Sequence, residues 1–199
     1  MKRLLIYMCI CAFIWANEVN DIIAQECIKQ YYPQVVAIRD NQVLLEDGSS
    51  FVWDDGKDKD YDEMLLNPDM KDAFTYPYPF KGKVANRNED TSRIRHLGFY
   101  KAIYGHSESE VREHLIWLPW FPEYFEKSFI LITTANGVDK AFRRVMERLT
   151  HLQQAYYQFL SDQDAFYWRN IADSPNLSPH SLGIALDINT QFSKYWLWD

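Results

Sequence analysis

Short alternating runs of apolar and polar residues mark residues 33–53 as the first strand-forming part of the chain. Apolar positions at 35–38 and 43–45 flank Asp40 and Asn41, a pair that favours tight turns. A third apolar run, 51–53, follows Asp47 and Gly48. The pattern predicts a small antiparallel hairpin over 33–53.

A capping pattern at Ser107 predicts a helix over 107–118. Glu110 stands three residues after this serine, as in a capping box, and Pro119 would end the helix. The apolar run 128–136 predicts a buried strand. A long amphipathic helix is expected from Gly137 onward, because apolar residues recur three or four positions apart at 138, 142, 145, 146, 149, 152, 156 and 159.

The last readable pattern is an alternation at 184–189. Ile184, Leu186 and Ile188 are apolar and are separated by Ala185 and Asp187, which predicts a strand with two distinct faces. Strands and helices are thus interspersed along the chain. This order predicts the α+β class, with a central, mostly antiparallel sheet and flanking helices.

An acidic run, DDGKDKDYDE at 54–63, follows the predicted hairpin. Asp58, Asp60 and Asp62 have the spacing that opens a calcium-binding loop, but Glu63 stands where that loop needs glycine. The run therefore predicts a solvated loop rather than a calcium site.

The first 24 residues have the form of a secretory signal peptide. A basic start, MKR, precedes an uncharged apolar run at 4–15, and Ala16 or Ala24 could precede the cleaved bond. The run is short for a membrane span, which takes roughly 20 apolar residues. We expect an exported protein, periplasmic or associated with the cell envelope, with no stable membrane span after cleavage. An uncleaved anchor or a buried N-terminal helix is the alternative.

The number of cysteines and the net charge limit how the protein can be stabilised and what it can bind. Cys9 and Cys11 lie inside the expected signal peptide, so only Cys27 remains after cleavage, and it cannot form an internal disulfide. The mature protein would depend on its core or on a metal. The net charge of −7 argues against a nucleic-acid partner, because binding phosphates requires a basic face.

The stretch LSPHSLGIALDIN at 177–189 carries the candidate chemistry. If the chain were fully extended, His180 and Asp187 would lie about 23 Å apart, whereas two ligands of one zinc ion each lie about 2 Å from it. The chain must therefore turn between them, and Gly183 accepts the backbone angles of a turn. The alternative without a metal is a histidine that caps the turn and an aspartate that hydrogen-bonds a loop.

Five positions of this stretch match the pattern S-x-H-x-x-G-x-A-x-D: Ser178, His180, Gly183, Ala185 and Asp187. The pattern resembles that of the zinc D-alanyl-D-alanine carboxypeptidase family, which includes cell-wall L-alanyl-D-glutamate endopeptidases and vancomycin-resistance dipeptidases. The resemblance implies the α+β fold that this family shares with the hedgehog signalling domain, the hedgehog/DD-peptidase fold. It covers residues 129–199, and 62–128 are loosely compatible with it.

The resemblance implies roles for individual residues. His180 and Asp187 would bind zinc. Ser178 would orient the histidine or its turn, and an ordinary turn residue is the alternative for this serine. The segment FYWRNIA at 166–172 corresponds to an aromatic-arginine segment in one branch of the family, so Arg169 would be catalytic, stabilising an oxyanion or holding a substrate carboxylate or carbonyl. A surface ion pair is the alternative for this arginine.

The activity implied by the resemblance is zinc-dependent hydrolysis of peptide bonds in peptidoglycan stem peptides, either carboxypeptidase-like or endopeptidase-like. Three segments are expected: a signal peptide (1–24), an N-terminal hairpin region (25–60) and a C-terminally truncated peptidase domain (61–199). The alternative function is a catalytically inactive domain that binds cell-wall peptides. A secreted domain that uses its aromatic residues to contact a protein partner is a further alternative.

The chain departs from the family downstream of Asp187. There the family has a third zinc ligand, a histidine, and an acidic general base three residues before it. In this sequence no histidine follows Asp187, and the only later acid is Asp199. Three explanations are open: the chain is a fragment, its activity has been lost, or an earlier histidine substitutes, with His106 preferred to His151.

Overall fold

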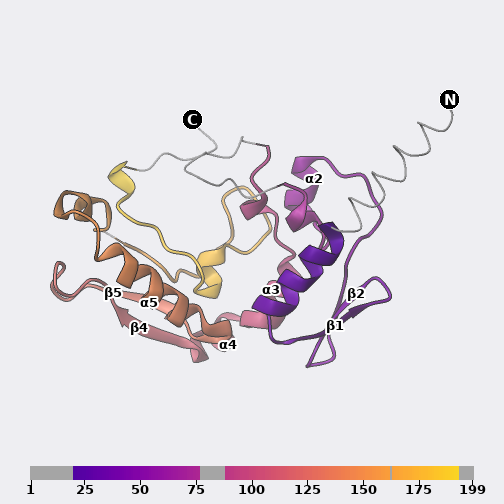
Figure 1. Ribbon diagram of the computed structural model, residues 1–199, viewed down its shortest axis with the longest axis horizontal. Coiled ribbons are helices and arrows are strands. Elements are labelled where there is room, and N and C mark those ends of the chain that lie inside the picture. Colours follow the sequence, from indigo (N-terminus) through magenta and orange to yellow (C-terminus); the bar gives the residue numbers. More distant parts are fainter. Residues whose placement is uncertain (1–19, 77–87, 162, 193–199) are drawn as a thin grey trace. The chain divides into compact units, whose positions relative to one another are not determined.

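The computed structural model describes residues 20–76, 88–161 and 163–192. The chain folds into two compact units, with the boundary after His96. A three-stranded antiparallel sheet forms in the first unit and a two-stranded antiparallel sheet in the second (Figure 1). The α+β class is confirmed. The single central sheet that the sequence predicted is not present in the described part of the chain, where the strands are shared between these two small sheets.

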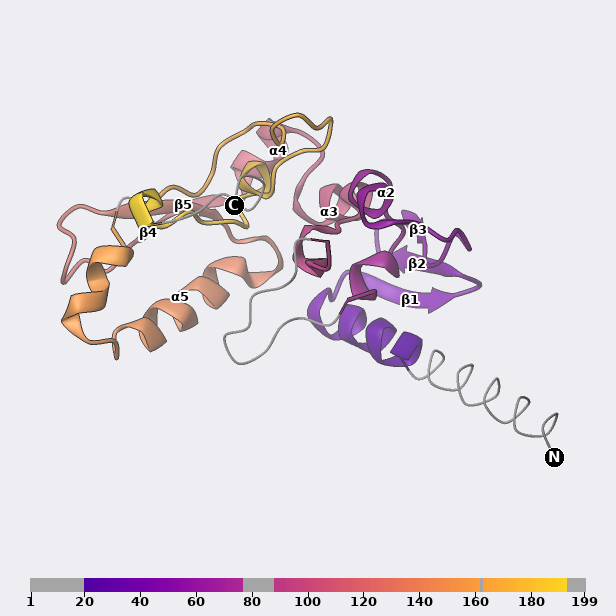
Figure 2. The same cartoon turned by 90° about the horizontal axis from the view of Figure 1, so that it is seen from above.

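The first described element of the first unit is a helix over residues 20–31, which Figure 2 shows beside the three-stranded sheet. Its inner face buries Ala24 and Ile28. Ala24, one of the two predicted cleavage positions, therefore lies inside a helix, while Ala16 and the rest of residues 1–19 lie outside the described residues. The predicted signal peptide stays a prediction, as do the expected segment limits at 24 and 60.

The predicted hairpin over 33–53 is confirmed as the sheet β1 (Val35–Arg39), β2 (Gln42–Leu45) and β3 (Ser50–Val52). Asp40 and Asn41, the predicted turn residues, both have positive φ, 50° and 59°. Two consecutive positive φ angles match the right-handed twist of a hairpin, and aspartate and asparagine tolerate them better than most residues.

The acidic run leads into α2 (Tyr61–Leu66) and the short 3-10 helices η1 (Asp72–Phe74) and η2 (Thr91–Arg93). Asp60 caps α2, accepting a hydrogen bond from the Glu63 amide while the Glu63 side chain bonds back to the Asp60 amide. These two acids therefore begin a helix rather than continue a solvated loop, which corrects the prediction at the end of the run.

The second unit contains α3, α4, the β4–β5 sheet, α5 and several short 3-10 helices. Their bounds are α3 (Leu97–Tyr104), α4 (Glu108–Glu113), β4 (Leu115–Pro119), β5 (Phe129–Thr133), η3 (Ala135–Gly137), α5 (Val138–Leu149), η4 (Gln154–Phe159), η5 (Pro179–Leu182) and η6 (Thr190–Phe192).

The helix predicted over 107–118 is right at its start and wrong at its end. Ser107 caps α4 by accepting a hydrogen bond from the Glu110 amide, as expected. However, the helix stops at Glu113, and residues 115–119 pair with β5. The apolar residues of this stretch gain more from pairing with the apolar 129–133 strand than from extending a short helix. Pro119 thus ends a strand and not a helix.

The core of the second unit packs between the β4–β5 sheet, α5 and the segment after it. Its buried members are Leu118, Trp120, Phe121, Ile130, Ile132, Tyr157, Leu160 and Ala165. The Trp120 indole donates a hydrogen bond of 2.8 Å to the Leu160 carbonyl, so this large ring is satisfied in the interior. Ala165 belongs to this core and Leu186 packs against it, which fixes two segments that matter below.

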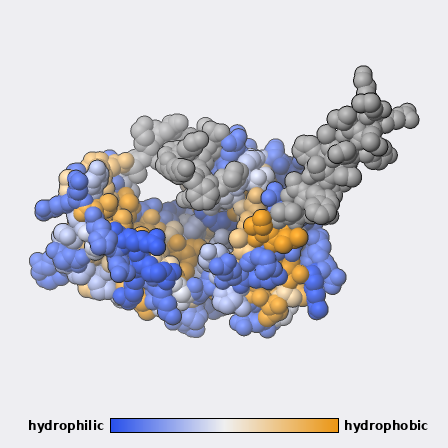
Figure 3. Space-filling view, in the orientation of Figure 1, coloured by the Kyte–Doolittle hydropathy of each residue, from blue (hydrophilic) through white to orange (hydrophobic). Residues whose placement is uncertain are grey.

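The predicted long helix is confirmed from Val138 but is shorter than expected. It ends at Leu149, and the last part of the apolar pattern forms η4 instead. Apolar residues on one face of α5, including Phe142 and Met146, pack against the core of the second unit. The face of the molecule in Figure 3 is otherwise mostly hydrophilic, with apolar patches on each unit.

Candidate functional site

The turn between His180 and Asp187 brings their side chains together. His180 lies in η5, and the distance from its Nε2 atom to Oδ2 of Asp187 is 3.3 Å. The turn is made at Gly183, whose φ is +67°. The expectation that the chain must turn here, at the glycine, is thus confirmed.

Gly183 also docks the turn onto the two-stranded sheet. A β-carbon at this position would lie 2.8 Å from Cδ2 of Leu115 and 2.9 Å from the amide nitrogen of Thr133, closer than real β-carbons approach. The Gly183 carbonyl accepts a hydrogen bond of 3.1 Å from that Thr133 amide. Both the positive φ and the close approach require glycine.

The His180 ring is held by its other nitrogen. Nδ1 lies 2.6 Å from the carbonyl oxygen of Ala165. A carbonyl only accepts hydrogen bonds, so Nδ1 carries the proton and Nε2 is the nitrogen that faces the Asp187 carboxylate. Histidines that bind metals have this arrangement, in which the second ring nitrogen donates to a carbonyl or carboxylate.

The separation of Nε2 and Oδ2 fits two ligands of one tetrahedral ion. Zinc lies about 2.0–2.2 Å from nitrogen and oxygen ligands, so two donors at the tetrahedral angle are about 3.3–3.6 Å apart. The observed distance between the His180 and Asp187 atoms is 3.3 Å. A proton on Nε2, which would make an ion pair, is the other way to satisfy this contact. The side chain of His180 is 12% exposed and that of Asp187 is 54% exposed, so the pair is reachable from solvent.

An extended segment, residues 163–169, is hydrogen-bonded to the backbone of both residues of the pair. On one edge, Asp164 and Asp187 exchange two backbone hydrogen bonds of 3.1 and 2.8 Å. On the other edge, the Tyr167 amide donates to the His180 carbonyl at 3.3 Å. The prediction of a strand at 184–189 is therefore wrong. Within the described residues, this stretch pairs with the segment 163–169 only at the Asp164–Asp187 bridge, which is too short to form a strand.

Arg169 has a fixed backbone and an exposed side chain. Its amide donates to the Ser181 hydroxyl at 2.7 Å, and its carbonyl accepts from that hydroxyl and from the Ser178 amide. The described residues give its guanidinium no partner, so neither the proposed catalytic role nor a surface ion pair has a contact in its favour. Ser178 caps the turn by accepting from the His180 amide at 3.4 Å, a contact that an ordinary turn residue also makes, so its expected role at a zinc site stays a prediction.

Two residues of the site were missed by the sequence reasoning. Ser181 is completely buried and joins the Arg169 segment to the His180 turn through its hydroxyl. Because Ser181 directly follows His180 in the sequence, it could have been considered as a residue of the site. Ala165 contributes its backbone carbonyl, and no sequence pattern identifies a carbonyl that a distant histidine will contact.

No earlier histidine completes the pair in the described part of the chain. Among those residues, the one set of three His, Cys, Asp or Glu ligand atoms within 4.8 Å of one another comes from Asp54, Asp55 and Asp69. Neither His106 nor His151 is therefore brought to His180 and Asp187. Most of the chain after Asp187, residues 193–199, lies outside the described ranges.

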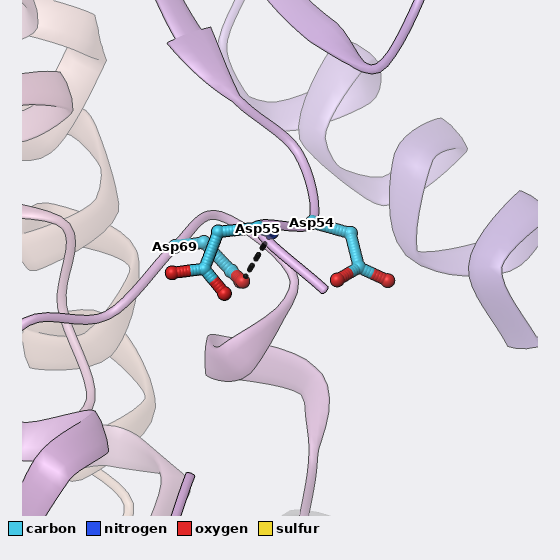
Figure 4. Close-up of side chains that lie close together, drawn as sticks. All are labelled: Asp54, Asp55 and Asp69. Atoms are coloured by element: carbon cyan, nitrogen blue, oxygen red, sulfur yellow. Dashed lines mark hydrogen bonds between the residues drawn. The ribbon is translucent and has the colours of Figure 1, made fainter. Parts of the chain in front are cut away.

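The cluster of Asp54, Asp55 and Asp69 lies in the first unit (Figure 4). The Asp69 carboxylate accepts hydrogen bonds from the Asp55 amide at 3.0 Å and from Lys59 at 3.2 Å. Lys59 is also 3.1 Å from Asp55, and Lys71 is 2.9 Å from Asp54. Each carboxylate already has a lysine partner, so a metal ion would have to displace ammonium groups.

The ionisation of this cluster agrees with a network held by lysines. Burial by itself would raise the pKa of Asp55, but the Lys57 amide and the Lys57 and Lys59 ammonium groups lower it to about 2. Burial opposes the charged form of Lys59, yet its bonds to Asp72, Asp55 and Asp69 raise its pKa above the ordinary value. We therefore regard the cluster as a structural ion network.

Comparisons of the chain with family models, with curated proteins and with solved structures gave no match. Among the described residues, no helix has the length and apolar character needed to cross a membrane.

Proposed function

We propose that the chain is a zinc-dependent peptidase that hydrolyses peptide bonds in peptidoglycan stem peptides, in the manner of D-alanyl-D-alanine carboxypeptidases or L-alanyl-D-glutamate endopeptidases. The observation that carries the proposal is the His180–Asp187 pair. Its donor atoms are 3.3 Å apart, and the second ring nitrogen of the histidine is held by the Ala165 carbonyl. The sequence pattern around the pair resembles that of this peptidase family.

The hedgehog/DD-peptidase fold and an exported location, periplasmic or at the cell envelope, belong to the same proposal. The fold is supported by the α+β class and by the turn that joins the two ligands. The location is supported by the signal-like pattern of the first residues and is the one that the proposed cell-wall substrate requires.

The residues of the site would divide the work as follows. His180 and Asp187 hold the ion, and the Ala165 carbonyl keeps the His180 ring in the tautomer whose Nε2 is free to bind. Bound zinc would supply activation of a water molecule, lowering its pKa to about 7, and polarisation of the scissile carbonyl. Arg169, exposed on a rigid backbone, would bind a carboxylate or carbonyl oxygen of the stem peptide.

One observation favours a second candidate, a cell-wall peptide-binding domain without catalysis. Zinc sites generally use three or more protein ligands, and the described residues place two at the pair. A two-ligand site would bind zinc weakly and leave peptide binding through Arg169 intact.

Zinc content and stem-peptide hydrolysis of the purified chain test the proposal. We expect zinc in the wild-type protein, its loss in His180→Ala and its retention in the matched variant His151→Ala, which removes an exposed histidine elsewhere in the unit. Release of D-alanine or cleavage after L-alanine would identify the reaction. A folded wild-type protein without zinc would overturn the metallopeptidase proposal. Stem-peptide binding without hydrolysis by the zinc-containing protein would favour the second candidate.

A further inference from the structure

We infer that three exposed aromatic side chains, those of Tyr156, Phe159 and Phe192, form a subsite for a sugar ring of the peptidoglycan strand. We call these three side chains the aromatic platform. The inference rests on the function proposed above and adds a second part of the substrate to it. The pattern at 178–187 that identifies the metal pair includes none of the three residues.

The three rings of the platform lie side by side in the second unit. The ring centroids of Phe159 and Phe192 are 4.8 Å apart, and those of Tyr156 and Phe159 are 6.3 Å apart. Figures 1 and 2 both show η4 and η6, the elements that contain these residues, at the same end of this unit. Single exposed apolar residues are common, whereas a contiguous exposed cluster is typical of a binding surface.

The platform is held in place by a buried asparagine. The side-chain amide of Asn189 donates to the Gln158 carbonyl at 2.6 Å and to the Ser161 hydroxyl at 2.9 Å. The Asn189 backbone amide also donates to the Ser161 carbonyl at 2.9 Å. These bonds join the residue before η6 to the end of η4, so the rings are positioned before a ligand arrives and lose little freedom on binding.

The platform lies on the same two stretches of chain as the metal pair. The backbones of Asp164 and Asp187 bond at one end of these stretches, and the platform lies at the other. From Asp187 to Asn189 the chain spans at most about 7 Å. From Asn189 to Phe192 it makes a turn, closed by a hydrogen bond of 3.1 Å from the Phe192 amide to the Asn189 carbonyl, and such a turn spans less than about 7 Å. The Cα atoms of Asp187 and Phe192 are therefore within about 14 Å of each other.

A sugar ring is the ligand that suits this platform. The C–H hydrogens on one face of a sugar ring are slightly positive and pack against the negative face of an aromatic ring. The Tyr156 hydroxyl has no hydrogen-bond partner among the described residues and is available to the hydroxyl or acetamido groups of an amino sugar. The proposed substrate supplies such a ring, because stem peptides are attached to the amino sugars of the peptidoglycan strand.

The short distance between the platform and the metal pair favours one of the two proposed reactions. The L-alanyl-D-glutamate bond is the first peptide bond after the sugar, whereas the D-alanyl-D-alanine bond lies three residues further, about 10 Å in an extended peptide. With a sugar on the platform, an extended stem peptide brings the first of these bonds to the pair and carries the second past it. The platform therefore favours endopeptidase action on peptides that carry their sugar.

Calorimetric titration of the full chain with three ligands tests the inference: the peptidoglycan disaccharide with its stem peptide, the stem peptide alone and the disaccharide alone. A chelator is present throughout, so binding is measured without zinc and without hydrolysis. We expect Phe192→Ala to weaken binding of both sugar-containing ligands at least fivefold and to leave binding of the free peptide unchanged. Phe192→Tyr, which keeps a ring, should retain the wild-type affinities.

The matched control is Phe74→Ala, which removes a ring of similar exposure from the first unit. The side chain of Phe74 is 42% exposed and that of Phe192 is 55% exposed. This control should leave the affinities for all three ligands unchanged. Equal losses in Phe74→Ala and Phe192→Ala would mean that the effect is not specific to the platform, and the inference would be overturned.

The outcomes separate this inference from the proposed function. If the wild type binds the stem peptide equally with and without its sugar, or if Phe192→Ala binds the sugar-containing ligands as tightly as the wild type, the subsite inference is overturned and the metal site is unaffected. If sedimentation shows a dimer that Phe192→Ala converts to a monomer, the rings are a contact between two copies and the inference is also overturned. A folded chain that binds the disaccharide through Phe192 but contains no zinc would keep the sugar subsite and overturn the peptidase.

Discussion

Gly183 occupies a position that excludes other residues for two separate reasons. Its backbone is left-handed, and a β-carbon would meet the Leu115 side chain and the Thr133 amide. Gly137 is left-handed too, with φ of +69°, but a β-carbon there would have nothing within 4 Å. The two glycines therefore separate the cost of backbone conformation from the cost of crowding.

Replacement of Gly183 by alanine is expected to destabilise the second unit more than the same change at Gly137. Both variants have the left-handed penalty, roughly 1–2 kcal/mol, and Gly183→Ala adds crowding that costs about 1–3 kcal/mol. Urea unfolding of the two variants gives the comparison. Equal losses would show that the turn shifts freely away from Thr133.

Ser181 joins the two halves of the site through one buried hydroxyl. Ser181→Ala removes a fully buried hydroxyl that accepts from the Arg169 amide and donates to the Tyr167 and Arg169 carbonyls, and the loss of such a hydrogen bond costs about 0.5–1.5 kcal/mol. We expect lower stability and faster hydrogen exchange at 167–170. Ser174→Ala, which removes a hydroxyl that accepts one bond from Asn176, is the control and should have a smaller effect. Unchanged exchange in Ser181→Ala would mean that water replaces the hydroxyl.

At the scale of elements, local chemistry determined the starts of elements better than their ends. The capping serine at 107 and the turn residues Asp40 and Asn41 act within a few positions of themselves, so the sequence predicted α4's start and the first hairpin correctly. The change from helix to strand after Glu113 depends on pairing with β5, more than ten residues away. A local pattern contains no information about that partner.

The same distinction applies to the site. Gly183 is close to His180 in sequence, and the turn between His180 and Asp187 could be predicted on the premise that both residues bind one ion. The Ala165 carbonyl and the bridge at Asp164 come from a segment brought alongside by the core, through Ala165 and Leu186. These contacts could not be predicted, because they depend on how the core packs.

Lys59 is the centre of the ion network that links the acidic run to η1. Its side chain is 6% exposed and lies within 3.2 Å of carboxylate oxygens of Asp55, Asp69 and Asp72. Lys59→Met leaves these partly buried carboxylates without their cation, which is expected to cost about 3 kcal/mol. Hydrogen exchange at 42–53 measures the loss. Lys57→Met, which removes a lysine that is 74% exposed, is the control and should change little.

The network also predicts a pH dependence. The pKa of Asp55 is lowered from 3.8 to about 2 in the folded chain. A carboxyl with a lowered folded pKa contributes stability that is complete above its unfolded pKa and is lost as the pH falls through the folded one. The first unit should therefore lose stability between about pH 4 and pH 2, and the loss should be shallower in Lys59→Met. Urea midpoints across this range provide the test, and parallel curves for the two proteins would contradict it.

At the scale of the whole molecule, each of the two units has buried residues of its own. Val43 is fully buried in the first unit, and Ile132 is fully buried in the second. A cavity in one unit should open that unit before it affects the other. We expect Val43→Ala to cost roughly 2 kcal/mol and Ile132→Ala about 2–5 kcal/mol, each with faster hydrogen exchange in its own unit. Faster exchange throughout the chain in both variants would show that the units unfold together.

The bonding around Arg169 has a consequence for proteolysis. Trypsin recognises an arginine side chain but must also draw the surrounding backbone into its own cleft. The Arg169 side chain is exposed, whereas its amide and carbonyl are bound to Ser181 and Ser178. The side chain that trypsin recognises is thus accessible, while the backbone on either side of it is held. A protease can cut after Arg169 only when the hydrogen bonds between this residue and the turn that contains His180 break. The rate of cleavage after Arg169 would therefore measure how often the segment 163–169 separates from the turn that contains His180.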